Sequence, residues 1–150
     1  MRLIASSLSC IIFYLVANFS AHALQVRSLN ENNSIPLTNQ YIQNSVWFFF
    51  KPHCAICIRQ VREFDCLERS IKKVAVGFGA SRFDLLKTSK KMSLKKMKAH
   101  LTLNASDELL RFFAIDKKIS PQLILFKNGK AIKYLKGFTK CTKLNSLLAD

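Results

Sequence analysis

The apolar run Val46–Phe50, which reads Val-Trp-Phe-Phe-Phe, constrains the fold of this chain more than any other feature. It contains no polar residue and is followed at once by Lys51-Pro52. A short run without polar alternation is typical of a strand that is buried on both faces, as in the middle of an α/β sheet. Other elements must therefore cover both faces of this strand.

The rest of the chain alternates between strand and helix signals. Further strands are expected at Val74–Phe78, Gln122–Lys127 and Ala131–Leu135, the last two joined by a hairpin turn at Asn128-Gly129. Helices are expected at Cys54–Ser70, at Ser81–Lys91 with Ser81 as N-cap, after Ser106, and from about Lys140 to Leu148. This order predicts an α/β fold, with a central mixed β-sheet flanked by helices on both faces.

Length and composition favour one folded domain. Of the 150 residues, 49% are hydrophobic and 22% are charged. Such a chain can bury one core and is not intrinsically disordered. Beyond the N-terminal segment, no stretch reaches the roughly 18 apolar residues of a membrane span, which excludes a multi-span protein.

Residues 1–23 have the layout of a secretory signal peptide. Arg2 gives a positive start, the apolar stretch Leu8–Val16 follows, and Ala21-His22-Ala23 fits a cleavage site. We expect this segment to be removed and the mature protein to lie in the periplasm. The alternative is an uncleaved N-terminus that anchors the protein in the inner membrane. Residues 24–43 are polar and are expected to form a loop or a loosely attached N-terminal arm, followed by the domain at 44–150.

The chemistry of the chain centres on Cys54-Ala55-Ile56-Cys57, where the buried strand ends and a helix begins. Cysteines three positions apart in a first helical turn can close a small disulfide. The N-terminal sulfur also faces the positive end of the helix dipole, which lowers the pKa of a thiol and favours its thiolate. Cys54 is therefore the predicted nucleophile, and Cys57 is predicted to resolve the mixed disulfide. The alternatives are a structural bridge or half a zinc site, for which the chain offers only isolated Cys66, His100 and Cys141 as further ligands.

A proline precedes the strand at Gln122–Lys127, in the sequence Ile119-Ser120-Pro121. Bonds to proline are the only common source of cis peptides, and proline is tolerated at the first residue of a strand. A cis bond here would leave the backbone of Ser120 as an unpaired strand edge that can bind an extended substrate backbone. The alternative is an ordinary trans proline.

Together these segments resemble the thioredoxin superfamily, and the export signal resembles its TlpA-type exported members. The resemblance covers about 44–150 and rests on Val46–Cys57, on the block Ile119–Lys130, and on Gly137 before the last helix. It implies a thioredoxin fold, a dithiol/disulfide site at Cys54 and Cys57, and a cis peptide bond before Pro121.

Two positions depart from the family pattern. Thioredoxins usually carry a buried acid six residues before the first cysteine, where this chain has Phe48. Deprotonation of Cys57 must then use water or another group. The usual tryptophan before the first cysteine is replaced by His53, which as a cation would stabilise the Cys54 thiolate and make the couple more oxidising. The alternative for His53 is a solvated loop residue.

The remaining mature cysteines, Cys66 and Cys141, leave two interpretations open. The first expectation is that each is a small buried apolar residue. The second is a Cys66–Cys141 disulfide, because the helices that carry them could lie against the same sheet.

The chain is strongly basic, with a net charge of +15. A lysine cluster comprises Lys87, Lys90, Lys91, Lys95, Lys96 and Lys98. Basic charge can indicate nucleic-acid or membrane binding, but an exported protein meets little nucleic acid and the cluster lacks interleaved aromatic residues. A solvated face, or one that attracts acidic proteins, is the expectation.

These observations predict an exported, monomeric thiol–disulfide oxidoreductase that needs no dissociable cofactor and binds no nucleic acid. Its expected partners are protein disulfide or dithiol substrates and a membrane or periplasmic thiol–disulfide protein that exchanges electrons with it. Ser120 and Pro121 are expected to shape the substrate groove. Two alternatives are a redox-inactive thioredoxin-like binding module and a carrier of copper or zinc that uses the same cysteines.

Overall fold

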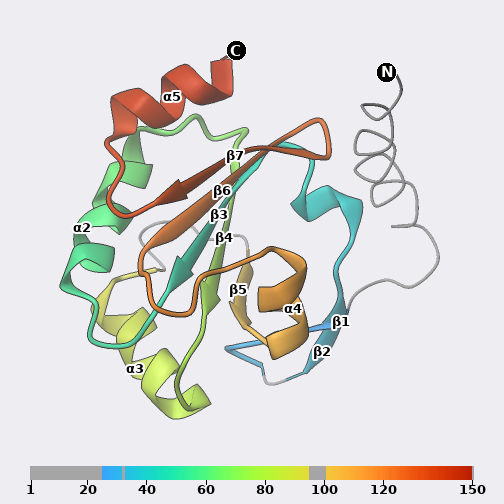
Figure 1. Ribbon diagram of the computed structural model, residues 1–150, viewed down its shortest axis with the longest axis vertical. Helices are drawn as coiled ribbons and strands as arrows, with labels where there is room; N and C mark the ends of the chain where they lie inside the picture. Colours follow the sequence, from blue (N-terminus) through green and yellow to red (C-terminus); the bar gives the residue numbers. More distant parts are fainter. Residues whose placement is uncertain (1–24, 32, 95–100, 150) are drawn as a thin grey trace, which may run out of the picture.

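A computed structural model describes residues 25–31, 33–94 and 101–149 (Figure 1). Their strands form one seven-stranded sheet in the order β2-β1-β5-β4-β3-β6-β7. The strands are β1 (Gln25–Ser28), β2 (Ser34–Pro36), β3 (Ser45–Phe50), β4 (Lys72–Gly77), β5 (Leu101–Asn104), β6 (Gln122–Lys127) and β7 (Lys130–Lys136). The helices are α2 (Ala55–Glu63), α3 (Arg82–Lys91), α4 (Asp107–Phe112) and α5 (Cys141–Ala149), with 3-10 turns η2 (Asn39–Tyr41) and η3 (Phe64–Cys66).

The sheet is mixed, and β3 lies inside it. This strand runs parallel to β4 and antiparallel to β6, so that Phe48 pairs with Ala75 on one side and Leu123 on the other. Strands β6 and β7 form the expected hairpin, in which Asn128 and Gly129 both adopt positive φ. Such φ values are those of a two-residue turn that matches the twist of the strands.

Side chains of β3 alternate between two cores, which confirms a strand buried on both faces. Phe48 and Phe50 pack into the core that contains Val61 of α2 and Leu144 of α5. Trp47 and Phe49 pack into the other core, beneath α4. The predicted architecture of helices on both faces of a mixed sheet is therefore confirmed, and Figure 1 shows α2 and α5 next to each other.

The N-terminal segment of the domain differs from the expectation of a loop or loosely attached arm. Strand β1 pairs antiparallel with both β2 and β5, so β1 and β2 extend the sheet. The side chains of β1 alternate between exposed and buried, and Val26 enters the core beneath α4. Of the polar residues that suggested a loop, Asn30, Glu31 and Asn33 are exposed and lie between β1 and β2. The predicted signal peptide at 1–23 lies outside the described residues.

Two other elements differ from the sequence analysis. Strand β5, which pairs parallel with β4, was not expected, since only four residues form it. The helix expected at Cys54–Ser70 ends earlier, because α2 tightens into η3 and Leu67 adopts an extended conformation. Helix α3 begins as expected, with the Ser81 hydroxyl accepting a hydrogen bond from the Asp84 N–H.

Contacts at Gln60 and at Cys66 connect the start of α5 and the residues before it to α2 and η3. The fully buried Gln60 side chain donates to the Thr139 carbonyl at 3.0 Å and accepts from the Thr139 N–H at 2.8 Å. Cys66 and Cys141 are joined by a disulfide with a Cα–Cα distance of 6.3 Å. Cys66 is exposed, so the expectation that it is a small buried apolar residue is wrong. It lies on the outer side of η3 rather than against the sheet.

We expect Gln60→Leu to lower the free energy of unfolding by about 2–4 kcal/mol, because the Thr139 N–H and carbonyl would stay buried without a partner. Chemical denaturation of the variant measures this loss. The matched control is Arg62→Gln on the exposed side of the same helix, which should change stability by no more than roughly 0.5 kcal/mol. Equal stability of Gln60→Leu and the parent protein would show that this pair does not hold α5.

Candidate active site

The two cysteines of the Cys54-x-x-Cys57 motif lie where β3 passes into α2. Four residues, 51–54, separate strand and helix, and His53 among them has a φ of 57°. This left-handed conformation, uncommon outside glycine, turns the chain from the sheet into the helix. Cys54 and Cys57 form a disulfide with a Cα–Cα distance of 5.2 Å.

The two sulfurs have different environments. Cys54 is the N-cap of α2 and is partly exposed, and its Sγ accepts a hydrogen bond from the Cys57 N–H at 3.1 Å. Cys57 is fully buried in the core beneath α2. An external group can therefore reach Cys54, whereas Cys57 can be reached only through Cys54. The helix N-terminus stabilises negative charge on the accessible sulfur.

The hydroxyl of Ser120 contacts both sulfurs. Its Oγ lies 3.1 Å from Cys57 Sγ and 3.6 Å from Cys54 Sγ. The Lys51 N–H donates to the same oxygen at 3.1 Å. Because the sulfurs of a disulfide carry no hydrogen, the hydroxyl is the donor in its contacts with them. Ser120 thus connects the loop before Cys54 with the loop before β6.

The peptide bond between Ser120 and Pro121 is cis, as the resemblance to thioredoxins implies. Pro121 is buried, and its carbonyl accepts a hydrogen bond from the Gly137 N–H at 2.8 Å. Among the described residues, the N–H and carbonyl of Ser120 have no hydrogen-bond partner. The backbone of Ser120 is therefore available beside the disulfide.

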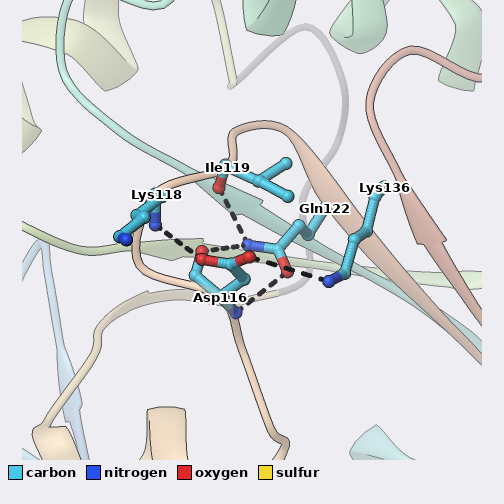
Figure 2. A network of polar contacts seen from close by, with 5 residues as sticks. All are labelled: Asp116, Lys118, Ile119, Gln122 and Lys136. Atoms are coloured by element: carbon cyan, nitrogen blue, oxygen red, sulfur yellow. Dashed lines mark hydrogen bonds and ion pairs between the residues drawn. The ribbon is translucent and has the colours of Figure 1, made fainter.

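The buried side chain of Gln122 holds the loop that carries Ser120 (Figure 2). Its Nε2 donates to the carbonyls of Asp116 and Ile119, both at 2.8 Å, and its Oε1 accepts from the Asp116 N–H at 3.1 Å. Figure 2 also shows the Asp116 carboxylate, which accepts from the Lys118 N–H at 2.9 Å and lies 3.7 Å from Lys136 Nζ. These contacts close residues 116–122 into a compact loop.

No acidic side chain contacts Cys57 in the described part of the chain. Phe48, at the position where thioredoxins have an acid, is fully buried and packs against the rings of Phe50 and Phe64. It belongs to the same core as Cys57. The Ser120 hydroxyl lies 3.1 Å from the buried sulfur.

Other residues named from the sequence lie apart from this cluster. His53 is exposed and has no hydrogen bond or ion pair with the described residues. Cys66 and Cys141 lie at the far end of α2. Of the lysine cluster, Lys87, Lys90 and Lys91 are exposed on α3 and the rest lies outside the described residues.

The resolved pKa shifts also lie away from the disulfide. Lys117 Nζ lies 2.7 Å from Asp107 Oδ1, and this hydrogen bond and charge lower the pKa of Asp107. Partial burial raises the pKa of Tyr134. Both residues are on the surface, and neither changes the charge at the cysteines.

Two parts of the site were not expected from the sequence. A role was expected for the Ser120 backbone but not for its hydroxyl, which contacts both sulfurs. No role was expected for Gln122. A glutamine at the start of an otherwise apolar strand, Gln122–Lys127, is the signal that could have identified a buried hydrogen-bonding side chain.

Solved structures of similar fold include a secreted disulfide oxidoreductase of Mycobacterium tuberculosis homologous to DsbE of E. coli. That chain is 12% identical, with a TM-score of 0.66 over 85% of this chain and 95% of its own. A thiol:disulfide interchange protein of the thioredoxin family from Chlorobium tepidum is 13% identical, with a TM-score of 0.65 over 84% and 90%. The exposed lipoprotein thioredoxin of Streptococcus pneumoniae is 16% identical, with a TM-score of 0.62 over 84% and 97%. No family model and no curated protein matches the sequence. The chain therefore has the thioredoxin fold.

We expect Gln122→Leu to loosen the loop at 116–120 and to lower the free energy of unfolding by about 2–4 kcal/mol, because it leaves buried backbone groups unpaired. Amide hydrogen exchange in this loop and chemical denaturation measure the two effects.

Lys136→Ala is the control, since it removes only the exposed ion pair with Asp116 and should cost roughly 0–1 kcal/mol. If the two variants exchange loop amides at the same rate, Gln122 does not hold the loop.

Proposed function

We propose that this chain is a thiol–disulfide oxidoreductase that exchanges disulfides with protein substrates through Cys54 and Cys57. One observation carries the proposal: a disulfide joins an accessible sulfur at a helix N-terminus to a fully buried sulfur. This asymmetry separates the roles of attack and resolution. A structural bridge needs neither an accessible sulfur nor a polar side chain placed against both sulfurs.

In the oxidising direction, a substrate thiolate attacks Cys54 Sγ and forms a mixed disulfide. The bond between the two protein sulfurs breaks, and its electron pair leaves on Cys57. A second substrate thiolate then attacks the substrate sulfur of the mixed disulfide, and Cys54 leaves as a thiolate. The substrate loses two electrons to become a disulfide, and the protein gains two electrons and, with two protons, becomes a dithiol.

In the reducing direction the same steps run backwards. The Cys54 thiolate attacks a protein disulfide, and Cys57 resolves the intermediate by attacking Cys54 Sγ. The Cys57 N–H at 3.1 Å and the N-terminus of α2 stabilise the attacking thiolate. A second thiol–disulfide protein restores the starting state.

Ser120 acts on the buried sulfur in this scheme. Since its oxygen accepts from the Lys51 N–H, its single hydrogen is free to donate to sulfur. When the disulfide opens, the charge develops on Cys57, 3.1 Å from this hydroxyl. The hydroxyl then stabilises the leaving thiolate in place of the acid that is absent at Phe48, and it passes the proton that Cys57 gains or loses.

The substrate lies along Ser120 and beside Ile56 in this proposal. The unpaired N–H and carbonyl of Ser120 can pair with an extended substrate segment as a short added strand. Ile56, next to the accessible cysteine and 48% exposed, offers an apolar contact. Pro121 keeps the groove open at the disulfide because it has no N–H of its own.

The proposed location is the periplasm, after removal of residues 1–23 as a signal peptide. Similar structures include one described as secreted and one described as an exposed lipoprotein, which supports an exported role. None of the helices in the described ranges is long and apolar enough to cross a membrane.

The function is tested by trapping substrates. Cys57→Ser leaves Cys54 able to form mixed disulfides but unable to release them, so we expect covalent complexes that reducing agent dissolves. They are measured by non-reducing gels and mass spectrometry of protein from the periplasm.

Cys54→Ser is the matched control, and both variants also carry Cys66→Ser and Cys141→Ser. The control should trap nothing, because Cys57, its remaining sulfur of the pair, is fully buried. Equal trapping by both variants, or by neither, would contradict the assigned roles. If neither variant traps and purified protein contains copper or zinc, the metal carrier replaces the enzyme.

Ser120→Ala should slow the opening of the Cys54–Cys57 disulfide by a dithiol about tenfold, because a hydrogen bond to a charged group contributes about 1.5 kcal/mol or more. Ser120→Thr keeps the hydroxyl and should retain most of the rate. Stopped-flow reduction, with thermal unfolding as a check on folding, makes the comparison. If the disulfide opened at the same rate in Ser120→Ala and Ser120→Thr, the hydroxyl would have no role in the mechanism.

A further inference from the structure

The second disulfide, Cys66–Cys141, lies on the surface. Cys66 is the last residue of η3 and is exposed, and Cys141 is the first residue of α5 and is partly exposed. Exposed disulfides exchange with external thiols more readily than buried ones, because the attacking thiolate must reach a sulfur. A disulfide whose only role is to stabilise the fold does not need to be exposed.

The surroundings of this disulfide suit both of its redox states. Asn145 Nδ2 lies 3.7 Å from Cys66 Sγ and 3.6 Å from Cys141 Sγ, so one side-chain amide faces both sulfurs. The Glu63 carbonyl lies 3.2 Å from Cys66 Sγ and can accept from this sulfur when it is a thiol. Polar groups that can pair with both sulfurs are therefore already in place before reduction.

The two sulfurs also differ as leaving groups. Cys141 begins the nine-residue helix α5, whose N-terminus favours negative charge. The Glu63 carboxylate, which accepts from the Cys141 N–H at 2.8 Å, opposes this effect. Cys66 is the more exposed of the two residues. Access therefore favours attack at Cys66 with departure of Cys141.

The contact between α2 and α5 does not depend on the bond. Gln60 and Thr139 are joined by two buried hydrogen bonds, and Leu144 of α5 is fully buried in the core. Reduction of Cys66–Cys141 should leave α5 in place.

From these observations we propose that Cys66–Cys141 is a second redox-active site, which exchanges with low-molecular-weight thiols of the glutathione class. A thiolate attacks Cys66 Sγ, and the electron pair of the broken bond leaves on Cys141. A second thiolate attacks the external sulfur of this mixed disulfide and releases Cys66. Two external thiols become one disulfide, and the protein gains two electrons and two protons.

This site is separate from the first disulfide. Cys54 and Cys66 lie at opposite ends of the segment formed by α2 and η3, roughly 18 Å apart at 1.5 Å per residue. Neither pair can attack the other within one molecule. A small thiol is the favoured partner because the described residues place no cis-proline loop beside Cys66, unlike Cys54.

The test uses the full mature chain with Cys54→Ser and Cys57→Ser, so that only the second pair can react. The protein is equilibrated in buffers of reduced and oxidised glutathione, and free thiols are counted by alkylation and mass spectrometry. Near-ultraviolet circular dichroism of the buried Trp47 reports folding. We expect reversible, two-electron reduction with an unchanged Trp47 signal.

A disulfide that resists excess reduced glutathione until denaturant unfolds the protein would overturn the proposal, as would reduction that abolishes the Trp47 signal. If the double variant does not fold, the same alkylation is mapped by proteolysis in the unmodified chain, where the peptides of Cys66 and Cys141 are distinguished from those of the first pair. This measurement follows only the redox state of Cys66 and Cys141. A negative result would therefore not contradict the function proposed for Cys54 and Cys57.

Asn145 provides a second measurement. Asn145→Ala should slow glutathione exchange about two- to fivefold, the loss expected for one modest hydrogen bond to the developing thiolate. Lys143→Ala, an exposed change on the same helix, is the control and should not alter the rate. An unchanged rate in Asn145→Ala would contradict the part assigned to this amide.

Discussion

The burial of β3 on both faces is the constraint on which the rest of the structure depends. Trp47 and Phe49 face one core, and Phe48 and Phe50 face the other. Because neither face can meet water, α2 and α5 must cover one side and α4 the other. The strand is therefore held rigidly, and the cysteines that follow it are fixed at its end.

The packing of the β3 side chains also determines which groups surround the Cys57 sulfur. The aromatic ring of Phe48 occupies the position at which thioredoxins usually have a buried carboxylate. The Cys57 sulfur therefore lies in an apolar core. A thiolate there is costly, since burial without a partner disfavours charge. In the proposed mechanism, the Ser120 hydroxyl and the N-terminus of α2 offset this cost. Both lie beside the partly exposed Cys54.

The loop before β6 is as important as the motif before α2. Ser120 contacts the sulfurs only because residues 116–122 hold a fixed shape, and the buried amide of Gln122 provides three of the hydrogen bonds that maintain it. A neutral amide suits this role because it donates and accepts at once without burying a charge. Two loops distant in the sequence thus meet at one hydroxyl.

Local sequence signals predicted the centre of the fold well and its edge poorly. The run at Val46–Phe50, the Asn128-Gly129 turn and the Ser81 cap are determined by neighbouring residues, and each was found. Strands β1, β2 and β5 were missed because they are short and depend on pairing with one another across the sheet. At the site, spacing predicted the Cys54–Cys57 pair, and the resemblance to thioredoxins implied the cis bond before Pro121. The Ser120 hydroxyl contact could not be predicted, because it depends on how two distant loops meet.

The most direct test of the central claim is the redox equilibrium of Cys54–Cys57, measured with Cys66 and Cys141 replaced by serine. The protein is equilibrated with glutathione buffers, and the fraction of disulfide is followed by alkylation. The account predicts one reversible two-electron transition, between roughly −270 mV, as in thioredoxin, and roughly −120 mV, as in a strong periplasmic oxidant. The absence of any reversible equilibrium would contradict the enzyme and leave a thioredoxin-fold binding module.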